Sequence, residues 1–260
     1  MKKFLLAPYY VIPLIILIFI RLLSPFYLIR LFPINSNRIG HFAGNTEVYI
    51  SKKKAKIDQP KKPYFDICYY EIDPKAKKQI CNDQFDLMVR RVLKIFPSYP
   101  FYYLGKLVRK LIPFFPNMQD HLILQREQDR DIHNLFPKFE SSFQFTSEEI
   151  KKGYGILENM GIEKNSEFVC LSVRDSAYLN RSFKNFDSTY HNYRDCSIDN
   201  FTLAAETIAN KGYYVLRMGK LVNSRLKTNN PKIIDYANTQ FRSDFMDVFL
   251  PAKCNFLIGP

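Results

Sequence analysis

Two charged residues, Arg174 and Asp175, closely follow a short apolar run at residues 168–171. An apolar run between polar clusters is typical of a strand that is buried on both faces. In an open α/β sheet, ligands bind just beyond the carboxyl ends of the strands, and a guanidinium offers a fork of donors that suits a phosphate. Arg174 is therefore a candidate phosphate clamp; the alternative is an ion pair between neighbours at the strand end.

A second group of candidates follows a predicted strand near the amino end and comprises Arg38, Gly40, His41 and Asn45. We expect a loop in which the glycine lets a ligand approach the backbone, and then a helix that Asn45 caps. A helix amino terminus beside such a loop accepts an anion or a substrate. Since a histidine pKa of about 6.5 suits proton abstraction near neutrality, His41 is the first candidate general base and Asp175 the second. A structural role for His41 is the alternative.

Strand patterns and helix patterns alternate along the chain with short connections. The predicted strands are residues 29–34, 65–72, 168–171, 213–218, 232–235 and 254–258. The predicted helices are residues 83–96, 102–111, 148–160, 198–210 and 244–252, and Thr146 with Glu149 has the spacing of a capping box. Such alternation requires a parallel sheet covered by helices. Arg194 lies in the long polar loop at residues 180–195, a place where functional residues gather.

The amino-terminal run at residues 4–20 contains no charged residue. It is at the short limit for crossing a hydrocarbon core of roughly 30 Å, and Pro8 and Pro13 interrupt it. Basic residues flank both ends, so they give no clear orientation. We expect residues 1–28 to associate with a membrane, either as a span or as an interfacial helix. A helix buried in the core is the alternative.

The net charge of +13 comes mainly from residues 1–150, which hold 23 Lys and Arg against 14 Asp and Glu. A basic surface can meet nucleic acid, an anionic bilayer or phosphorylated substrates. No nucleic-acid-binding motif accompanies the charge, so nucleic acid is not an expected partner. The five cysteines are scattered without a C-x-x-C pair, which indicates a reduced, cytoplasmic-side protein. The four histidines have unrelated spacings, so no metal site is predicted.

Several ordered blocks resemble a family of bacterial glycosyltransferases linked to surface-polysaccharide synthesis. The blocks are FVCLSVRDSAYL, YRDCSIDNF, GYYVLRMGK, NPKIIDYAN and FRSDFMDVFLPAKCNFLIG, and the earlier RIGHFAGNTE is similar to the amino-terminal motif of that family. The resemblance covers residue 29 to the end and implies a GT-B-like α/β fold, in which two Rossmann-like domains face one another across a cleft. With a hydrophobic helix at residues 1–28, the acceptor-side domain is then residues 29–144 and the nucleotide-sugar-side domain residues 145–260.

The resemblance also implies a reaction and a set of site residues. A sugar would move from a nucleotide-activated donor to a cell-surface glycan or a lipid-linked acceptor, on the cytoplasmic side of the inner membrane. Arg38, Gly40 and His41 would face the acceptor, and Arg174 would lie near the donor phosphates. The same cleft would be lined by Arg217, Gly219, Lys220, Ser243 and Asp244. Neither a cofactor nor a metal is implied, because helix amino ends and basic side chains hold the diphosphate in such enzymes.

Related enzymes continue past the strand that ends in LIG into a glycine loop and a helix that hold the donor. The resemblance therefore predicts that the second domain is incomplete and that the chain is a fragment. Two other functions stay open at this point. One is a membrane-anchored α/β module that binds a phosphorylated ligand or a partner without chemistry. The other is nucleic-acid binding, which the charge alone suggests.

Overall fold

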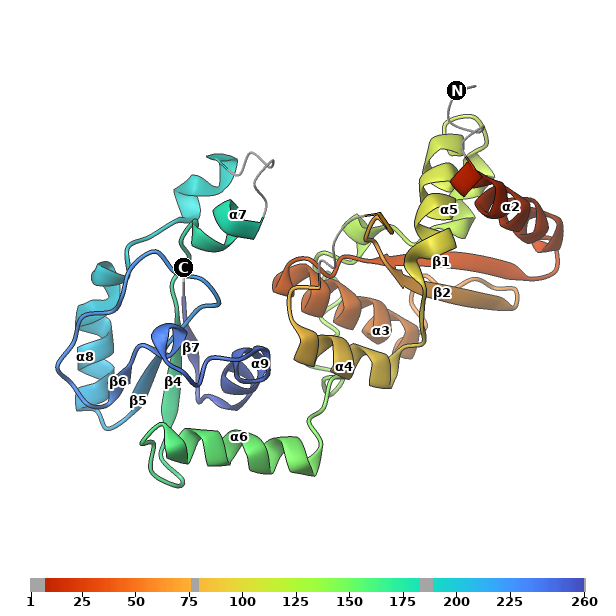
Figure 1. Ribbon diagram of the computed structural model, residues 1–260. Coiled ribbons are helices and arrows are strands. Elements are labelled where there is room, and N and C mark those ends of the chain that lie inside the picture. The colour runs from red at the N-terminus through yellow and green to blue at the C-terminus, as the bar shows by residue number, and fades with distance from the viewer. Residues whose placement is uncertain (1–7, 76–79, 183–188, 260) are drawn as a thin grey trace. The chain divides into compact units, whose positions relative to one another are not determined.

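The computed structural model describes residues 8–75, 80–182 and 189–259 (Figure 1). Its sheets are built from parallel strands. The chain divides into two units, Met1–Gln144 and Phe145–Pro260. Each unit has its own sheet, and all pairings between the named strands of both sheets are parallel. The predicted α/β class with parallel sheets is therefore confirmed.

The first unit contains a three-stranded sheet in the order β1-β2-β3. Its strands are β1 (Leu28–Ile34), β2 (Tyr64–Tyr70) and β3 (Ile95–Phe96). Its α-helices are α2 (Val11–Leu23), α3 (Thr46–Lys54), α4 (Asp83–Val92) and α5 (Ser98–Leu111). Shorter helical turns are η1 (Pro8–Tyr10), η2 (His41–Asn45), η3 (Pro116–His121) and η4 (Gln125–Glu127).

Alternating side chains of β1 and β2 face two different helix layers, as expected for a strand period of two. Leu31 and Tyr69 belong to the apolar cluster that contains residues of α2 and α5. On the other face, the Phe32 ring stacks on Tyr49 of α3 at 3.9 Å between ring centroids. Both faces of this sheet are thus covered by helices (Figure 1).

One helix prediction in this unit is wrong at its end. The helix predicted over residues 83–96 stops at Val92, because Leu93 has an extended backbone with φ −121° and ψ 136°. Ile95 and Phe96 then pair with β2 as β3. The Phe96 ring packs edge-on against Phe65 and Phe101. Ile95 and Phe96 continue the apolar pattern of the predicted helix, but they pack as a strand beside β2 instead.

The second unit contains a four-stranded sheet in the order β6-β5-β4-β7. Its strands are β4 (Phe168–Ser172), β5 (Tyr214–Met218), β6 (Ile233–Ile234) and β7 (Leu257–Ile258). Its α-helices are α6 (Ser147–Asn159), α7 (Ala177–Ser182), α8 (Thr202–Asn210) and α9 (Asp244–Lys253). Shorter helical turns are η5 (Thr189–Arg194), η6 (Ile198–Phe201) and η7 (Tyr236–Asn238).

Two apolar clusters hold the second sheet between its helices. Cys170 and Leu216 pack with residues of α6 and α9 on one face. Leu171 and Val215 pack with residues of α8 on the other face. The strand predicted at residues 168–171 is confirmed as β4, and its side chains from Phe168 to Leu171 are buried as expected.

The capping box that the sequence predicts at the start of α6 is also confirmed. Thr146 Oγ1 accepts a hydrogen bond from the Glu149 amide at 3.2 Å, and Glu149 Oε2 accepts one from the Thr146 amide at 2.9 Å. Ser243 Oγ accepts a hydrogen bond from the Met246 amide at the start of α9. Within the described part of the chain, no helix combines the length and apolar character needed to cross a bilayer.

Candidate functional site

The order of strands in the second sheet identifies its candidate ligand-binding edge. The chain runs outward from β4 to β5 and β6, and it then returns to place β7 on the other side of β4. In open parallel sheets, ligands bind beyond the carboxyl ends of the strands where the order reverses. That position lies between the carboxyl ends of β4 and β7, at Ser172 and Gly259.

Gly259 allows the backbones at this edge to approach closely. A Cβ atom at position 259 would lie 2.8 Å from the carbonyl oxygen of Ser172. Since real Cβ atoms essentially never come this close to a backbone oxygen, only glycine fits without a shift. Glycine at position 259 therefore lets the carboxyl ends of β4 and β7 pack closely together.

Arg174 stands in an ion pair at the end of β4, but its partner is not an adjacent residue as the alternative had it. Its Nε atom lies 3.4 Å from Asp195 Oδ1, and its carbonyl oxygen accepts a hydrogen bond from the Cys196 amide at 2.9 Å. The partner is thus Asp195 from the end of the long loop, and not the neighbour Asp175. About a quarter of the Arg174 side chain remains exposed to solvent.

Asp175 fastens two loops to one another. Its Oδ1 accepts a hydrogen bond from the Ala177 amide at 2.9 Å, and its Oδ2 accepts one from the Asn223 amide at 2.8 Å. The first bond shapes the turn after β4, and the second reaches the segment after β5. Protonating this carboxylate would weaken both bonds, so the geometry suits a positioning residue better than a general base.

Arg217 is a buried cation that joins the ends of neighbouring strands. Its side chain is 1% exposed, and Nη1 lies 3.2 Å from Asp235 Oδ1 while Nη2 lies 3.9 Å from Asp175 Oδ2. Its Nε is buried with no hydrogen-bond partner among the described residues. Two carboxylates thus balance one guanidinium, which makes Arg217 a structural centre of this edge and not a surface clamp.

The amino end of α9 is occupied by the protein's own charged groups. Asp244 Oδ1 lies 3.0 Å from Lys220 Nζ and 2.9 Å from Arg242 Nη2. Arg242 also pairs with Asp247. Burial lowers the pKa of Arg242, but Asp247 and Asp244 outweigh that effect and raise it. A phosphate at this end of the helix would compete with Asp244 for Lys220 and Arg242.

Gly219 has a backbone conformation that favours glycine. Its φ is +153°, within the region that glycine tolerates and other residues rarely adopt. A Cβ there would also lie 2.5 Å from Cγ1 of Val222. Arg194 is exposed at the end of η5, next to Asp195. The structure thus joins Asp175 to Arg217 and Lys220 to Asp244, while Arg174 pairs separately with Asp195.

Sequence reasoning missed several residues of this edge. Asp235 follows β6 directly, as Arg174 follows the end of β4, so the strand-end rule that selected Arg174 also points to Asp235. Asp195 lies at the end of the long polar loop at residues 180–195, where the sequence predicts that functional residues gather. Arg242 and Gly259 gave no local signal, because their roles depend on groups that are distant in sequence.

The group predicted in the first unit lies on a helix and not in a loop. Residues 39–54 are helical without a break, and Gly40 has φ −61° and ψ −46°. Asn45 also has a helical backbone and makes no capping hydrogen bond with its side chain. The predicted loop at His41 and the predicted cap at Asn45 are therefore wrong. No heavy atom lies within 4 Å of a Cβ built at Gly40, so close backbone approach does not require this glycine.

The early start of this helix has a packing cause. The Phe42 side chain is fully buried and packs edge-on against Tyr70 and Phe85, and its amide donates a hydrogen bond to the Arg38 carbonyl. Burying Phe42 in this way draws the preceding residues into the helix. His41 consequently lies at an exposed position on the helix. Arg38 lies directly before the first turn of the helix and is half-buried.

Two buried hydroxyl groups lie in the same part of the first unit. Ser36 Oγ follows the carboxyl end of β1, and Thr46 Oγ1 begins α3. Both side chains are almost completely buried, and neither oxygen has a hydrogen-bond partner among the described residues. A buried polar atom without a partner is costly and therefore calls for an explanation. Because both oxygens are also closed to solvent, a ligand could reach them only if the surrounding side chains moved.

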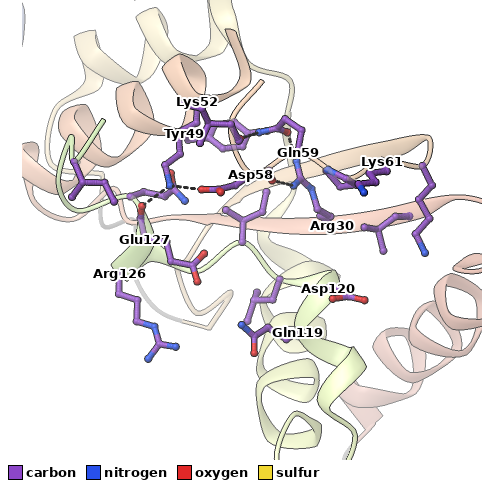
Figure 2. A pocket seen from close by; sticks show the side chains of 18 residues that line it. Arg30, Tyr49, Lys52, Asp58, Gln59, Lys61, Gln119, Asp120, Arg126 and Glu127 are labelled. Carbon is purple, nitrogen blue, oxygen red and sulfur yellow. Dashed lines mark hydrogen bonds and ion pairs between the residues drawn. The ribbon is translucent and has the colours of Figure 1, made fainter. Parts of the chain in front are cut away.

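A separate cavity of about 980 Å³ lies beside the amino end of β1 (Figure 2). Lys52 is almost completely buried there, and its Nζ donates hydrogen bonds to Asp58 Oδ2 at 3.0 Å and to the Glu127 carbonyl at 3.1 Å. Arg30 Nη2 donates to Gln59 Oε1 at 3.0 Å. None of the predicted site residues lines this cavity. The two buried cations in its lining, Arg30 and Lys52, already have partners in the protein. The cavity is therefore a weaker candidate for binding an anion.

Comparison with protein-family models, with curated proteins and with solved structures gave no match in any of the three. Among the described residues, no group of three or more His, Cys, Asp or Glu side chains is arranged to hold a metal ion. The candidate site is thus defined by its geometry alone.

Proposed function

We propose that the protein is a glycosyltransferase that moves a sugar from a nucleotide-activated donor to a cell-surface glycan or a lipid-linked acceptor. The observation that carries this proposal is the strand reversal at Ser172 and Gly259, which the partly exposed cation Arg174 closely follows in the chain. Edges of this kind receive phosphates and nucleotides in parallel α/β units. The proposal includes a GT-B-like arrangement, in which the first unit binds the acceptor.

In this proposal the donor diphosphate lies at the carboxyl ends of β4 and β7. Arg174 is the cation best suited to reach it, because its side chain is partly exposed and its contact with Asp195 is long for an ion pair. On binding, its guanidinium exchanges part of that contact for the phosphates. A cation in this place stabilises the negative charge that develops on the leaving diphosphate oxygen.

The acceptor hydroxyl requires a base, and His41 is the residue proposed for that role. Its exposed position on the helix lets a substrate reach the ring. Arg38 lies just ahead of the same helix and is proposed to contact an acidic part of the acceptor.

Calorimetry of the 260-residue chain with nucleoside diphosphates and nucleotide sugars tests the proposal. We expect one nucleotide to bind, and the Arg174→Gln variant to lose at least about tenfold in affinity, since a charge-assisted bond contributes about 1.5–3 kcal/mol. Arg130→Gln is the matched control, because Arg130 is largely exposed and its one ion pair within the described part of the chain is with its neighbour Asp129. Equal affinities for the two variants would remove Arg174 from the role.

A second function has one observation in its favour. The cations Arg174, Arg217 and Lys220 are each matched by a carboxylate in the structure. This pairing is compatible with an α/β module that binds a phosphorylated ligand or a partner without chemistry. Nucleotide-sugar binding with no release of the nucleoside diphosphate, even when acceptors are supplied, would favour the module over the enzyme.

A further inference from the structure

Helix α2 is apolar at every position except Arg21, yet only one side of it is covered. Pro13, Leu17 and Ile20 are buried, and Leu17 and Ile20 join the apolar cluster of the first unit. Large apolar side chains on the other side, together with Phe26 in the following turn, are 47% to 79% exposed. They are Val11, Ile12, Ile15, Ile18, Phe19, Leu22 and Phe26.

These exposed side chains form a continuous stripe. Val11, Ile15, Ile18 and Leu22 follow one another at the spacing of one helix face. Phe114 and Phe115, which follow α5, are also more than half exposed. They lie close by in the fold, since α5 packs on α2 and the Asn117 carbonyl lies 3.5 Å from Arg21 Nη1. The stripe with Phe26, Phe114 and Phe115 is called the apolar face below.

The chain segments that build the apolar face carry positive charge only. Residues 1–46 and residues 97–119 contain no Asp and no Glu. The described cations of the helices concerned are Arg21 in α2 and Lys106, Arg109 and Lys110 in α5, and Arg109 among them is paired with Glu71. At the end of α2, Lys62 Nζ donates a hydrogen bond to the Ser24 carbonyl at 2.5 Å. Apolar side chains are therefore bordered by cations along this surface.

We propose that the apolar face binds the interfacial region of a bilayer that contains anionic lipids. The apolar side chains enter the boundary between headgroups and acyl chains, while Arg21, Lys62 and Lys110 meet the lipid phosphates. Helix α2 lies flat on the membrane in this arrangement. Its 13 residues measure about 20 Å, which is too short to cross a hydrocarbon core of roughly 30 Å. Its buried side is also packed against the rest of the first unit.

Charge distinguishes this occupant from a second copy of the chain. A symmetric dimer through the apolar face would place the same surface patch on both sides of the contact. The cations of one copy would then meet the cations of the other, which opposes association. An anionic bilayer supplies the opposite charge and an apolar interior together. The inference is independent of the proposed sugar transfer and does not depend on nucleotide binding.

A fluorescent reporter tests the contact directly, because the chain contains no tryptophan. Phe19→Trp places one indole on the apolar face, and Leu203→Trp places one on α8 of the second unit, where Leu203 is 80% exposed. We expect vesicles of phosphatidylcholine with phosphatidylglycerol to shift the emission of the Phe19→Trp protein to shorter wavelength and to leave the control unchanged. An unchanged Phe19→Trp spectrum, or an equal shift in both proteins, would overturn the proposal.

Vesicle flotation supplies the quantitative test. We expect the double variant Ile15→Ser and Phe19→Ser to bind these vesicles at least about tenfold more weakly, because two large apolar groups no longer leave water. Leu203→Ser is the matched control and should bind as the unsubstituted chain does. Binding should also weaken with added salt and on pure phosphatidylcholine. Circular dichroism confirms that each variant is folded.

Two results, one from flotation and one from sedimentation, would overturn the inference. One is the absence of binding to the anionic vesicles at low salt. The other is a dimer in sedimentation that the double variant abolishes while vesicle binding stays unchanged, which would assign the apolar face to a second copy.

Discussion

Gly153 of α6 faces the ring of Phe249 of α9, and a methyl group at this position would have no room. A Cβ built on Gly153 would lie 2.2 to 2.5 Å from three carbon atoms of that ring. Phe249 is completely buried, and its ring packs against Phe145, Tyr154 and Phe245. The ring therefore cannot turn away, and we expect Gly153→Ala to push α6 from α9.

Gly155 provides the matched control in the same helix, since no heavy atom lies within 4 Å of a Cβ built there. Replacing a helical glycine with alanine stabilises by about 0.8–1 kcal/mol when the site is open, and this is the gain expected for Gly155→Ala. At Gly153 overpacking of about 1–3 kcal/mol opposes that gain. With contacts this short, we expect a net loss of about 1–2 kcal/mol.

Urea denaturation followed by circular dichroism measures both variants. The midpoint should fall for Gly153→Ala and rise for Gly155→Ala, and the slope should stay the same in both. A Gly153→Ala protein that is as stable as Gly155→Ala would refute the reasoning, because α6 and α9 would then not be in close contact. Since α9 starts at the candidate site, that result would also remove the support on which Ser243 and Asp244 are positioned.

Two further predictions concern buried charge in the first unit. Asp66→Asn should destabilise by about 3–5 kcal/mol in urea denaturation, because Arg30, which donates to both Asp66 oxygens at 2.7 and 2.9 Å, keeps a buried charge without its partner. Lys53→Met, at the exposed side of the same carboxylate, should cost less than about 1 kcal/mol. Equal losses of stability in the two variants would contradict this ranking. Burial lowers the pKa of His121, opposed by its bond to the Ile29 carbonyl at 2.7 Å and assisted by Arg21. Because the folded-state pKa of His121 lies below the unfolded value of about 6.5, the stability that the buried neutral ring contributes is complete above that pH and is lost as the pH falls below it. Thermal denaturation of His121→Gln should therefore show a flatter dependence on pH than the unsubstituted chain. An unchanged pH profile would contradict this role of His121.

The features that local sequence predicts best are those that local physics decides. The buried strand β4 follows from an apolar run between polar clusters. The capping box at Thr146 follows from two residues three positions apart. In each case the determining groups are neighbours in the chain, so the pattern contains the cause.

Features that depend on distant contacts escaped prediction. The helix before α3 starts early because Phe42 packs on Tyr70 and Phe85. β3 forms because its two residues reach the edge of β2. The ion pair of Arg174 joins residues that are 21 positions apart, and its partner Asp195 follows a long loop. Sequence reasoning thus located the edge of the second sheet but not the pairing of charges along it.

The most direct measurement of the central claim is amide hydrogen exchange of the 260-residue chain, with and without a saturating nucleoside diphosphate selected by calorimetry. If the carboxyl edge of the second sheet holds the donor, exchange should slow at residues 172–177 and 217–220 and at Gly259, and Arg174→Gln should abolish the effect. Protection confined to the first unit, or no protection at either place under saturating ligand, would contradict the claim that this edge is a nucleotide site.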